Sequence, residues 1–133
     1  MAPAAFATDT GGSVRQPCSF CGVTGIKPTY GRTSRYGLVA YGSSLDTVGM
    51  IAHDVADLAL LFQHIAGFDP LDATSAQQPV PQIEFSESPD LKGLRIGVPE
   101  EYFIKGIQPE VENGVMAAIK QLESLGAATI PVT

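Results

Sequence analysis

Two amphipathic stretches constrain the fold of this chain most, because their apolar residues recur at the spacing of an α-helix. Asp54 can cap the first helix, and Gly67 and Gly126 can end the first and second helices. A chain with two such helices is not an all-β protein. The recurring positions are Val55, Leu58, Phe62 and Ile65 in residues 54 to 66, and Val111, Val115, Ala118, Ile119 and Leu122 in residues 109 to 125.

The second helix lies between two short apolar segments that have the pattern of strands. Residues 94 to 98 precede it and residues 128 to 132 follow it. Strands joined through a helix in this way pair in parallel, so residues 93 to 133 should form one βαβ unit. The sequence therefore predicts the α/β class.

The rest of the chain is rich in glycine or proline. In residues 1 to 53 the glycines predict tight loops and short strands. Residues 72 to 92 include Pro79, Pro81 and Pro89 and show no periodicity, which predicts an extended connection over a surface. With 133 residues and 44% hydrophobic content, the chain forms one domain or part of a larger one.

Charge and composition exclude several classes of protein. The net charge of −6 disfavours a general polyanion-binding protein and a membrane-surface protein. No apolar run approaches the roughly 18 residues of a spanning helix, and the first residues have no basic leader region. We therefore expect a soluble, unexported chain, cytoplasmic or, in a eukaryote, organellar. Cys18 and Cys21 lack a second ligand pair for zinc and are predicted to be buried structural thiols.

Residues 9 to 17, with the sequence DTGGSVRQP, are the candidate site. Adjacent glycines before a serine can present consecutive N–H groups to an anionic oxygen, either an oxyanion or a phosphate. A phosphate loop would need Lys and then Ser or Thr after the glycines, but Val14 and Arg15 follow Ser13. A nucleophile elbow would need glycine at position 15. By loop statistics alone an ordinary turn is the more frequent explanation.

Residues 9 to 11 also match the catalytic Asp-Thr-Gly of aspartic proteases. Those enzymes are almost entirely β, and the two helices predicted above argue against them. The alternative would make Asp9 the catalytic acid.

The same stretch, followed by FCGVTGIKPTYGR at residues 20 to 32, resembles the second half of the amidase signature. Members of that family are serine hydrolases with a Ser-cisSer-Lys triad and a mixed sheet flanked by helices. Residues 34 to 46, 66 to 75 and 91 to 103 are similar to the branch that hydrolyses glutamine to supply ammonia for Glu-tRNA(Gln) amidation. Proteins of that family are several times longer than one domain of about 150 residues. We therefore expect this chain to be an internal segment of such a protein.

The resemblance implies a role for each signature residue. Ser13 matches the nucleophile that forms the acyl-enzyme, and Thr10, Gly11 and Gly12 match the loop whose N–H groups form the oxyanion hole. Asp9, Arg15 and Gln16 match supporting positions, and for Asp9 and Arg15 we favour an ion pair that braces the loop. The family's lysine and cis-serine precede the nucleophile, and the twelve residues before Ser13 contain neither. We therefore expect the 133 residues alone to be inactive.

The resemblance also implies partners. Glutamine is the expected substrate, and the enzyme would work with two other amidotransferase subunits on Glu-tRNA(Gln). ATP and magnesium would bind a partner subunit, so this chain needs no cofactor or metal. Met50, Ala52 and His53 depart from the residues common in the family. Together with the missing lysine, they keep a non-catalytic remnant as an alternative. A stand-alone amidase for small amides is a further alternative, because the residues that select substrate in the family lie mostly outside this segment.

Overall fold

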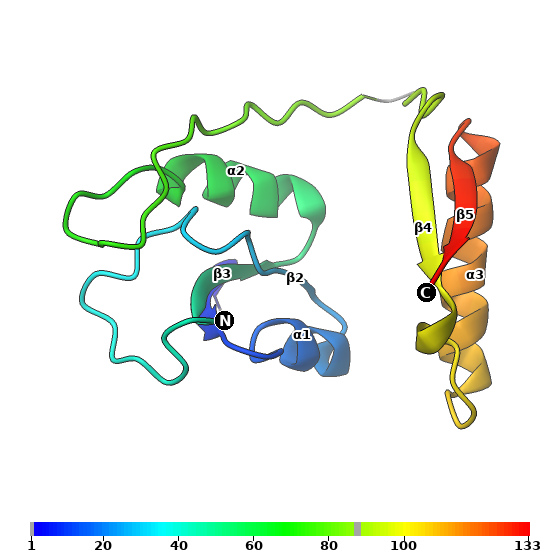
Figure 1. Cartoon of the computed structure of the whole chain (residues 1–133), viewed down its shortest axis with the longest axis horizontal. Helices are drawn as coiled ribbons and strands as arrows, with labels where there is room; N and C mark the ends of the chain where they lie inside the picture. Colours follow the sequence, from blue (N-terminus) through cyan, green and yellow to red (C-terminus); the bar gives the residue numbers. More distant parts are fainter. Residues whose placement is uncertain (1, 87–88) are drawn as a thin grey trace. The chain divides into compact units, whose positions relative to one another are not determined.

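The computed structural model describes residues 2 to 86 and 89 to 133, which form two compact units (Figure 1). The first unit is Met1–Phe85 and the second is Ser86–Thr133. Each unit has its own sheet, three-stranded in the first and two-stranded in the second. The predicted α/β class is confirmed.

The sheet of the first unit is antiparallel and has β3 (Thr47–Ala52) at its centre. β1 (Ala4–Asp9) pairs with one edge of β3, and β2 (Thr24–Ile26) pairs with the other. In the β1–β3 register Asp9 lies opposite Thr47. The residues that follow β1 therefore meet those that precede β3, which places the Gly-Gly-Ser loop beside residue 46.

A short helix, α1 (Arg15–Cys21), connects β1 to β2. Our expectation of only loops and short strands in residues 1 to 53 was wrong here. Pro17 is compatible with α1 because it lies in the first turn, where no N–H bond to a preceding carbonyl is lost. The side chains of Val14 and Cys18, four residues apart, lie on one side of the segment and are both buried.

Glycine in the sheet is what allows α1 to approach it. A methyl group on Gly25 would lie 2.4 Å from Sγ of Cys18, and one on Gly49 would lie 3.2 Å from Cγ2 of Val14. Successive residues in a strand lie on opposite faces of the sheet, so Gly49 and its neighbour Met50 lie on different faces of β3. α1 therefore packs on the glycine face.

The helix expected at residues 54 to 66 is α2 (Val55–Ile65), and its contacts are with β3 and β2. Asp54 caps it by accepting a hydrogen bond from the Asp57 N–H at 2.9 Å. Leu58 and Phe62 join Met50 and Ala52 in the buried core, whereas Val55, expected on the same face, is exposed. The core therefore lies on the face of β3 opposite to α1.

The described part of residues 72 to 92 contains no helix or strand, as expected for an extended connection. Its first half follows the surface of the first unit. Arg32 donates to the carbonyl oxygens of Gln78 at 3.1 Å and Pro79 at 2.6 Å. The N–H of Ile83 donates to Oε1 of Gln63 on α2 at 3.2 Å. The backbone of the connection is therefore attached at several points.

The second unit is the predicted βαβ unit. β4 (Arg95–Pro99) and β5 (Ala128–Val132) pair in parallel, and the 3-10 helix η1 (Glu100–Tyr102) and α3 (Pro109–Ser124) connect them. No residue of α3 is buried, and Val111 and Val115, expected on its apolar face, are exposed in this structure. No helix in the described residues is long and apolar enough to cross a membrane.

Candidate nucleophile site

The candidate site is the loop between β1 and α1, and Asp9 organises it. The Asp9 carboxylate is fully buried and accepts hydrogen bonds from the N–H groups of Gly12 at 2.8 Å, Val14 at 3.1 Å and Arg15 at 3.2 Å. It also receives two bonds at 3.0 Å from the Arg15 side chain, through Nε and Nη2. Asp9 therefore fixes the path of the whole turn.

This environment keeps the Asp9 carboxylate charged. The Arg15 guanidinium, helped by the three backbone N–H groups, holds the pKa of Asp9 well below its usual range although burial opposes the charge. An aspartic protease needs a pair of carboxylates that share a proton. Asp9 is instead paired with an arginine, so the aspartic protease alternative is wrong and the expected ion pair is present.

Ser13 lies on the outside of the turn. Its side chain is exposed, while the next residue, Val14, is completely buried and anchors the turn against the sheet. No residue in the described ranges shares a hydrogen bond with the Ser13 hydroxyl. The arrangement presents an accessible hydroxyl group on a fixed backbone, and a nucleophile at this position would still need an adjacent base.

The predicted oxyanion loop is present as a turn, and its amides differ in availability. Gly12 has φ +144°, a conformation that favours glycine, and its N–H is already donated to Asp9. Among the described residues, no acceptor takes the N–H groups of Gly11 and Ser13. A methyl group on Gly11 would meet nothing within 4 Å, so the space outside this residue is open.

Thr10 is held by a second carboxylate that sequence reasoning did not single out. The Thr10 hydroxyl donates to Oδ1 of Asp46 at 2.5 Å. Asp46 also accepts from the N–H of Tyr41 at 2.9 Å and from the N–H of Gly42 at 3.0 Å. The Thr10 hydroxyl and the two amides lower the pKa of Asp46 despite its burial. No local motif signals this contact, because 36 residues separate its partners.

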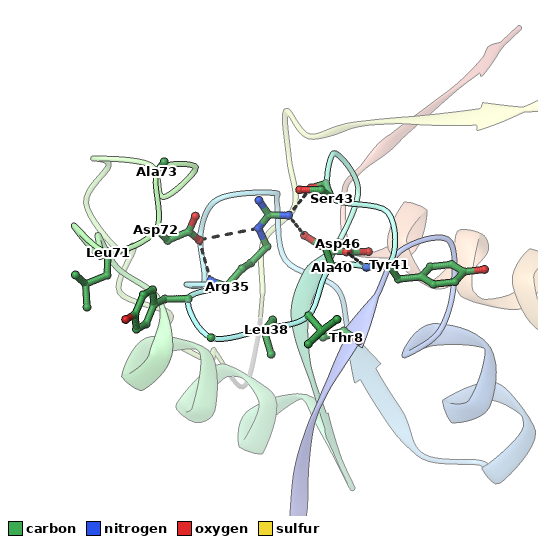
Figure 2. Close-up of a pocket in the computed structure, with 13 residues that line it drawn as sticks. Thr8, Arg35, Leu38, Ala40, Tyr41, Ser43, Asp46, Leu71, Asp72 and Ala73 are labelled. Atoms are coloured by element: carbon green, nitrogen blue, oxygen red, sulfur yellow. Dashed lines mark hydrogen bonds and ion pairs between the residues drawn. The ribbon is translucent and has the colours of Figure 1, made fainter.

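Next to Asp46, the Arg35 side chain forms part of the lining of a cavity of about 280 Å³ (Figure 2). Figure 2 shows its guanidinium between Asp72 and the carbonyl groups of Ser43 and Asp46. The guanidinium also stacks on the Tyr30 ring, 4.6 Å from the ring centroid. Arg35 thus braces the loop that contains Asp46.

Asp72 supports Arg35 from the other side of the cavity. Its carboxylate accepts from the Arg35 N–H at 2.8 Å and from the Thr74 hydroxyl at 2.7 Å, and its pKa is lowered, chiefly by that hydroxyl. Ser13 is not part of the cavity lining. Asp46 lines the cavity and also accepts the hydrogen bond from Thr10, so it connects the cavity to the nucleophile loop.

Other residues considered from the sequence lie apart from the reacting hydroxyl. Gln16 is exposed and its N–H donates to the Gly12 carbonyl at 2.7 Å. Lys27 Nζ donates to the Pro28 carbonyl at 2.8 Å and is not hydrogen-bonded to Ser13. Cys18 is buried as expected, but Cys21 is exposed, so half of that prediction was wrong. The described residues contain no cluster of three metal-ligating side chains.

Known proteins are similar to this chain over most of its length. The profile of the Amidase family matches residues 1–133. The A subunit of glutamyl-tRNA(Gln) amidotransferase from Roseiflexus sp. (strain RS-1) is 58% identical over 126 residues, which are 95% of this chain and 26% of that protein. The same protein of Moorella thermoacetica is 61% identical over 92% of this chain and 25% of its own length. The chain thus spans about a quarter of the length of these curated relatives.

Solved structures of amidases and related hydrolases also match this chain over nearly its whole length. The glutamyl-tRNA(Gln) amidotransferase A subunit of Thermotoga maritima matches 98% of this chain and 29% of its own, with a TM-score of 0.87 and 46% identity. Allophanate hydrolase of Kluyveromyces lactis matches 98% of this chain and 21% of its own, with a TM-score of 0.82 and 28% identity. A 6-aminohexanoate cyclic dimer hydrolase matches 98% of this chain and 28% of its own, with a TM-score of 0.82 and 30% identity.

Proposed function

Because the chain belongs to the amidase family, we propose that it supplies the nucleophile and the oxyanion loop of an enzyme that hydrolyses the side-chain amide of glutamine. The ammonia released would convert Glu-tRNA(Gln) to Gln-tRNA(Gln). The observation that supports this most is the Asp9-anchored turn, which leaves the Ser13 hydroxyl exposed beside two unused N–H groups.

In the proposed reaction, Oγ of Ser13 attacks the amide carbon of glutamine while its proton passes to a base. The tetrahedral intermediate collapses to a γ-glutamyl ester on Ser13, and the amide nitrogen takes up a proton and leaves as ammonia. Water then attacks the ester, releasing glutamate and restoring the hydroxyl. A serine hydroxyl needs an adjacent base for the first step.

The oxyanion of the intermediate would be stabilised by the N–H groups of Gly11 and Ser13. One such donor is worth about 3 to 4 kcal/mol of barrier. The N–H of Gly12 already serves Asp9, so we assign Gly12 the conformational role that its φ of +144° allows. Asp9 and Arg15 hold the donors in place, and the Gln16 N–H donates to the Gly12 carbonyl of the same turn.

We place the base outside these 133 residues, as the lysine and the cis-serine that relays the proton in the family. The described residues put no lysine in hydrogen-bond contact with Ser13, since Lys27 is bonded to its own neighbour's carbonyl. By the same resemblance, the two other amidotransferase subunits bind the tRNA and use ATP with magnesium. The setting that we propose is the cytoplasm.

A stand-alone amidase for other amides is the second candidate. Two of the similar structures, allophanate hydrolase and 6-aminohexanoate cyclic dimer hydrolase, act on other compounds. Their sequence identities of 28% and 30% are lower than the 58% to the Roseiflexus protein, which is why we favour glutamine.

The test places this chain in the Thermotoga maritima protein, in exchange for the segment that it matches, and assembles the hybrid with the partner subunits of that enzyme. Glutamine hydrolysis should occur and should fall by about 10⁶-fold in Ser13→Ala. Ser19→Ala is the matched control, because Ser19 is an exposed serine on α1, and it should keep full activity. Preference for another amide would support the second candidate, and an inactive but folded hybrid would support the remnant.

A further inference from the structure

Asp46 joins two segments that are distant in sequence. One oxygen, Oδ1, accepts from the Thr10 hydroxyl at 2.5 Å, and the carboxylate also accepts from the N–H groups of Tyr41 and Gly42. Asp46 is 6% exposed. A buried carboxylate that accepts three hydrogen bonds has one favourable position. It can therefore fix the position of the Thr10 hydroxyl that donates to it.

The segment that it fixes is the candidate oxyanion loop. At the far end of this loop, Asp9 holds the N–H groups of Gly12 and Val14. At the near end, the Thr10 hydroxyl is bound to Asp46. Gly11 lies between the two attachment points, with its N–H unused and open space around it. Two carboxylates on different segments therefore define where this N–H group lies.

Packing of the Thr10 methyl group further restricts the rotamer of the Thr10 side chain. A methyl group on Gly42 would lie 2.8 Å from Cγ2 of Thr10 and 3.8 Å from Oδ1 of Asp46. The Thr10 methyl group is thus packed against the Gly42 backbone while its hydroxyl is bound. Since threonine has few χ1 rotamers, contacts at both branches fix its side chain.

We infer that Asp46 is a positioning residue for the amidase reaction, which sets the oxyanion loop through the Thr10 hydroxyl. The inference rests on the proposed function of Ser13. Asp46 touches no reacting atom. Its effect is on the placement of the Gly11 and Ser13 N–H groups relative to the developing oxyanion, so its loss slows the chemical step and leaves substrate binding largely intact.

Asp72 provides a matched control. It is 9% exposed, and it too accepts from a threonine hydroxyl and from backbone N–H groups, but it touches no residue of the nucleophile loop. Asp46→Asn and Asp72→Asn remove the same charge from similar surroundings. A merely structural role for Asp46 would make the two variants alike.

The experiment compares Asp46→Asn, Thr10→Val, their double variant and Asp72→Asn in the Thermotoga hybrid. Loop misplacement of about 1 Å costs up to about 100-fold in rate. Asp46→Asn and Thr10→Val should each lower kcat by about tenfold or more with KM changed less than about twofold. The double variant should be no slower than the slower single variant, because both break one contact. Thr10→Ser, which keeps the hydroxyl, should restore most of kcat.

A second measurement does not depend on activity. Amide hydrogen exchange at Gly12, whose N–H is bound to Asp9, should become faster in Asp46→Asn and change much less in Asp72→Asn, which acts on the loop of Asp46 through Arg35. Equal kcat in Asp46→Asn and Asp72→Asn, with equal exchange at Gly12, would overturn the inference. If instead Ser13→Ala keeps activity, the proposed function fails, while the exchange result still decides whether Asp46 positions the loop.

Discussion

The guanidinium of Arg15 and the carboxylate of Asp9 form a two-point ion pair, with Nε 3.0 Å from Oδ2 and Nη2 3.0 Å from Oδ1. Asp9 is completely buried, whereas half of the Arg15 side chain is exposed. The arginine covers the carboxylate at the end of β1 and closes the turn that contains Ser13. The contact belongs both to the fold and to the candidate site.

Asp9→Asn should therefore destabilise the first unit. The amide removes the charge that holds Arg15 and turns one acceptor into a donor facing backbone N–H groups. We expect the free energy of unfolding to fall by about 2 to 4 kcal/mol, measured by urea denaturation. Glu84→Gln, an exposed acidic residue, is the control and should change it by less than about 0.5 kcal/mol. Equal stability of the two variants would contradict the bracing role.

Acid should destabilise the fold through Asp9, Asp46 and Asp72. The pKa of each carboxyl is lowered from its ordinary 3.8, so each stabilises the folded state at pH values above 3.8. This contribution is lost as the pH falls through 3.8 toward the lower folded-state pKa. Urea denaturation should show a free energy of unfolding that is nearly constant from about pH 7 to 5 and falls below about pH 4.5. In Asp9→Asn the free energy of unfolding should fall less steeply as the pH is lowered. A slope equal to that of the wild type would contradict this account.

Gly49→Ala should be poorly tolerated, because the added methyl group would lie 2.4 Å from the carbonyl oxygen of Ile26 in the neighbouring strand. Neither backbone can move without breaking the β2–β3 pairing. The loss should be about 1 to 3 kcal/mol, measured as a shift of the thermal or urea midpoint. Gly114→Ala on α3, where the methyl group meets nothing within 4 Å, should be neutral or slightly stabilising. A tolerated Gly49→Ala would mean that α1 and β2 pack differently.

The two cysteines should react at different rates. Cys21 is exposed, while Cys18 is buried and burial raises the pKa of its thiol. A thiol-reactive disulfide reagent should modify one cysteine rapidly in the folded chain and both after denaturation. Cys21→Ser should remove the rapid phase and Cys18→Ser should keep it. Two fast thiols in the native chain would show that α1 does not pack as described.

Periodic sequence patterns predicted most of the regular structure. α2, α3 and the parallel strands around α3 could be predicted because apolar spacing, capping residues and glycine stops agree along each segment. α1 could not, because it is seven residues long, contains Pro17 and buries only Cys18. Its stability comes from the room that Gly25 and Gly49 provide in the sheet, which no local pattern encodes.

The candidate site was predictable only in its local part. Residues 9 to 17 carry a recognisable motif, and the bond from Arg15 to Asp9 spans six residues. The contacts of Asp46 with Thr10 and of Arg35 with Asp72 span 36 and 37 residues. They arise from the β1–β3 register and from the path of residues 66 to 85, so a sequence without its fold does not reveal them.

Covalent labelling of Ser13 tests the central claim most directly. The Thermotoga hybrid would be treated with a fluorophosphonate, digested and analysed by tandem mass spectrometry, with Ser13→Ala and Ser19→Ala alongside. The account predicts one phosphonyl adduct on Ser13, absent from Ser13→Ala and retained in Ser19→Ala, formed in parallel with the loss of glutamine hydrolysis. An adduct on another residue, or full inhibition with Ser13 unmodified, would contradict it.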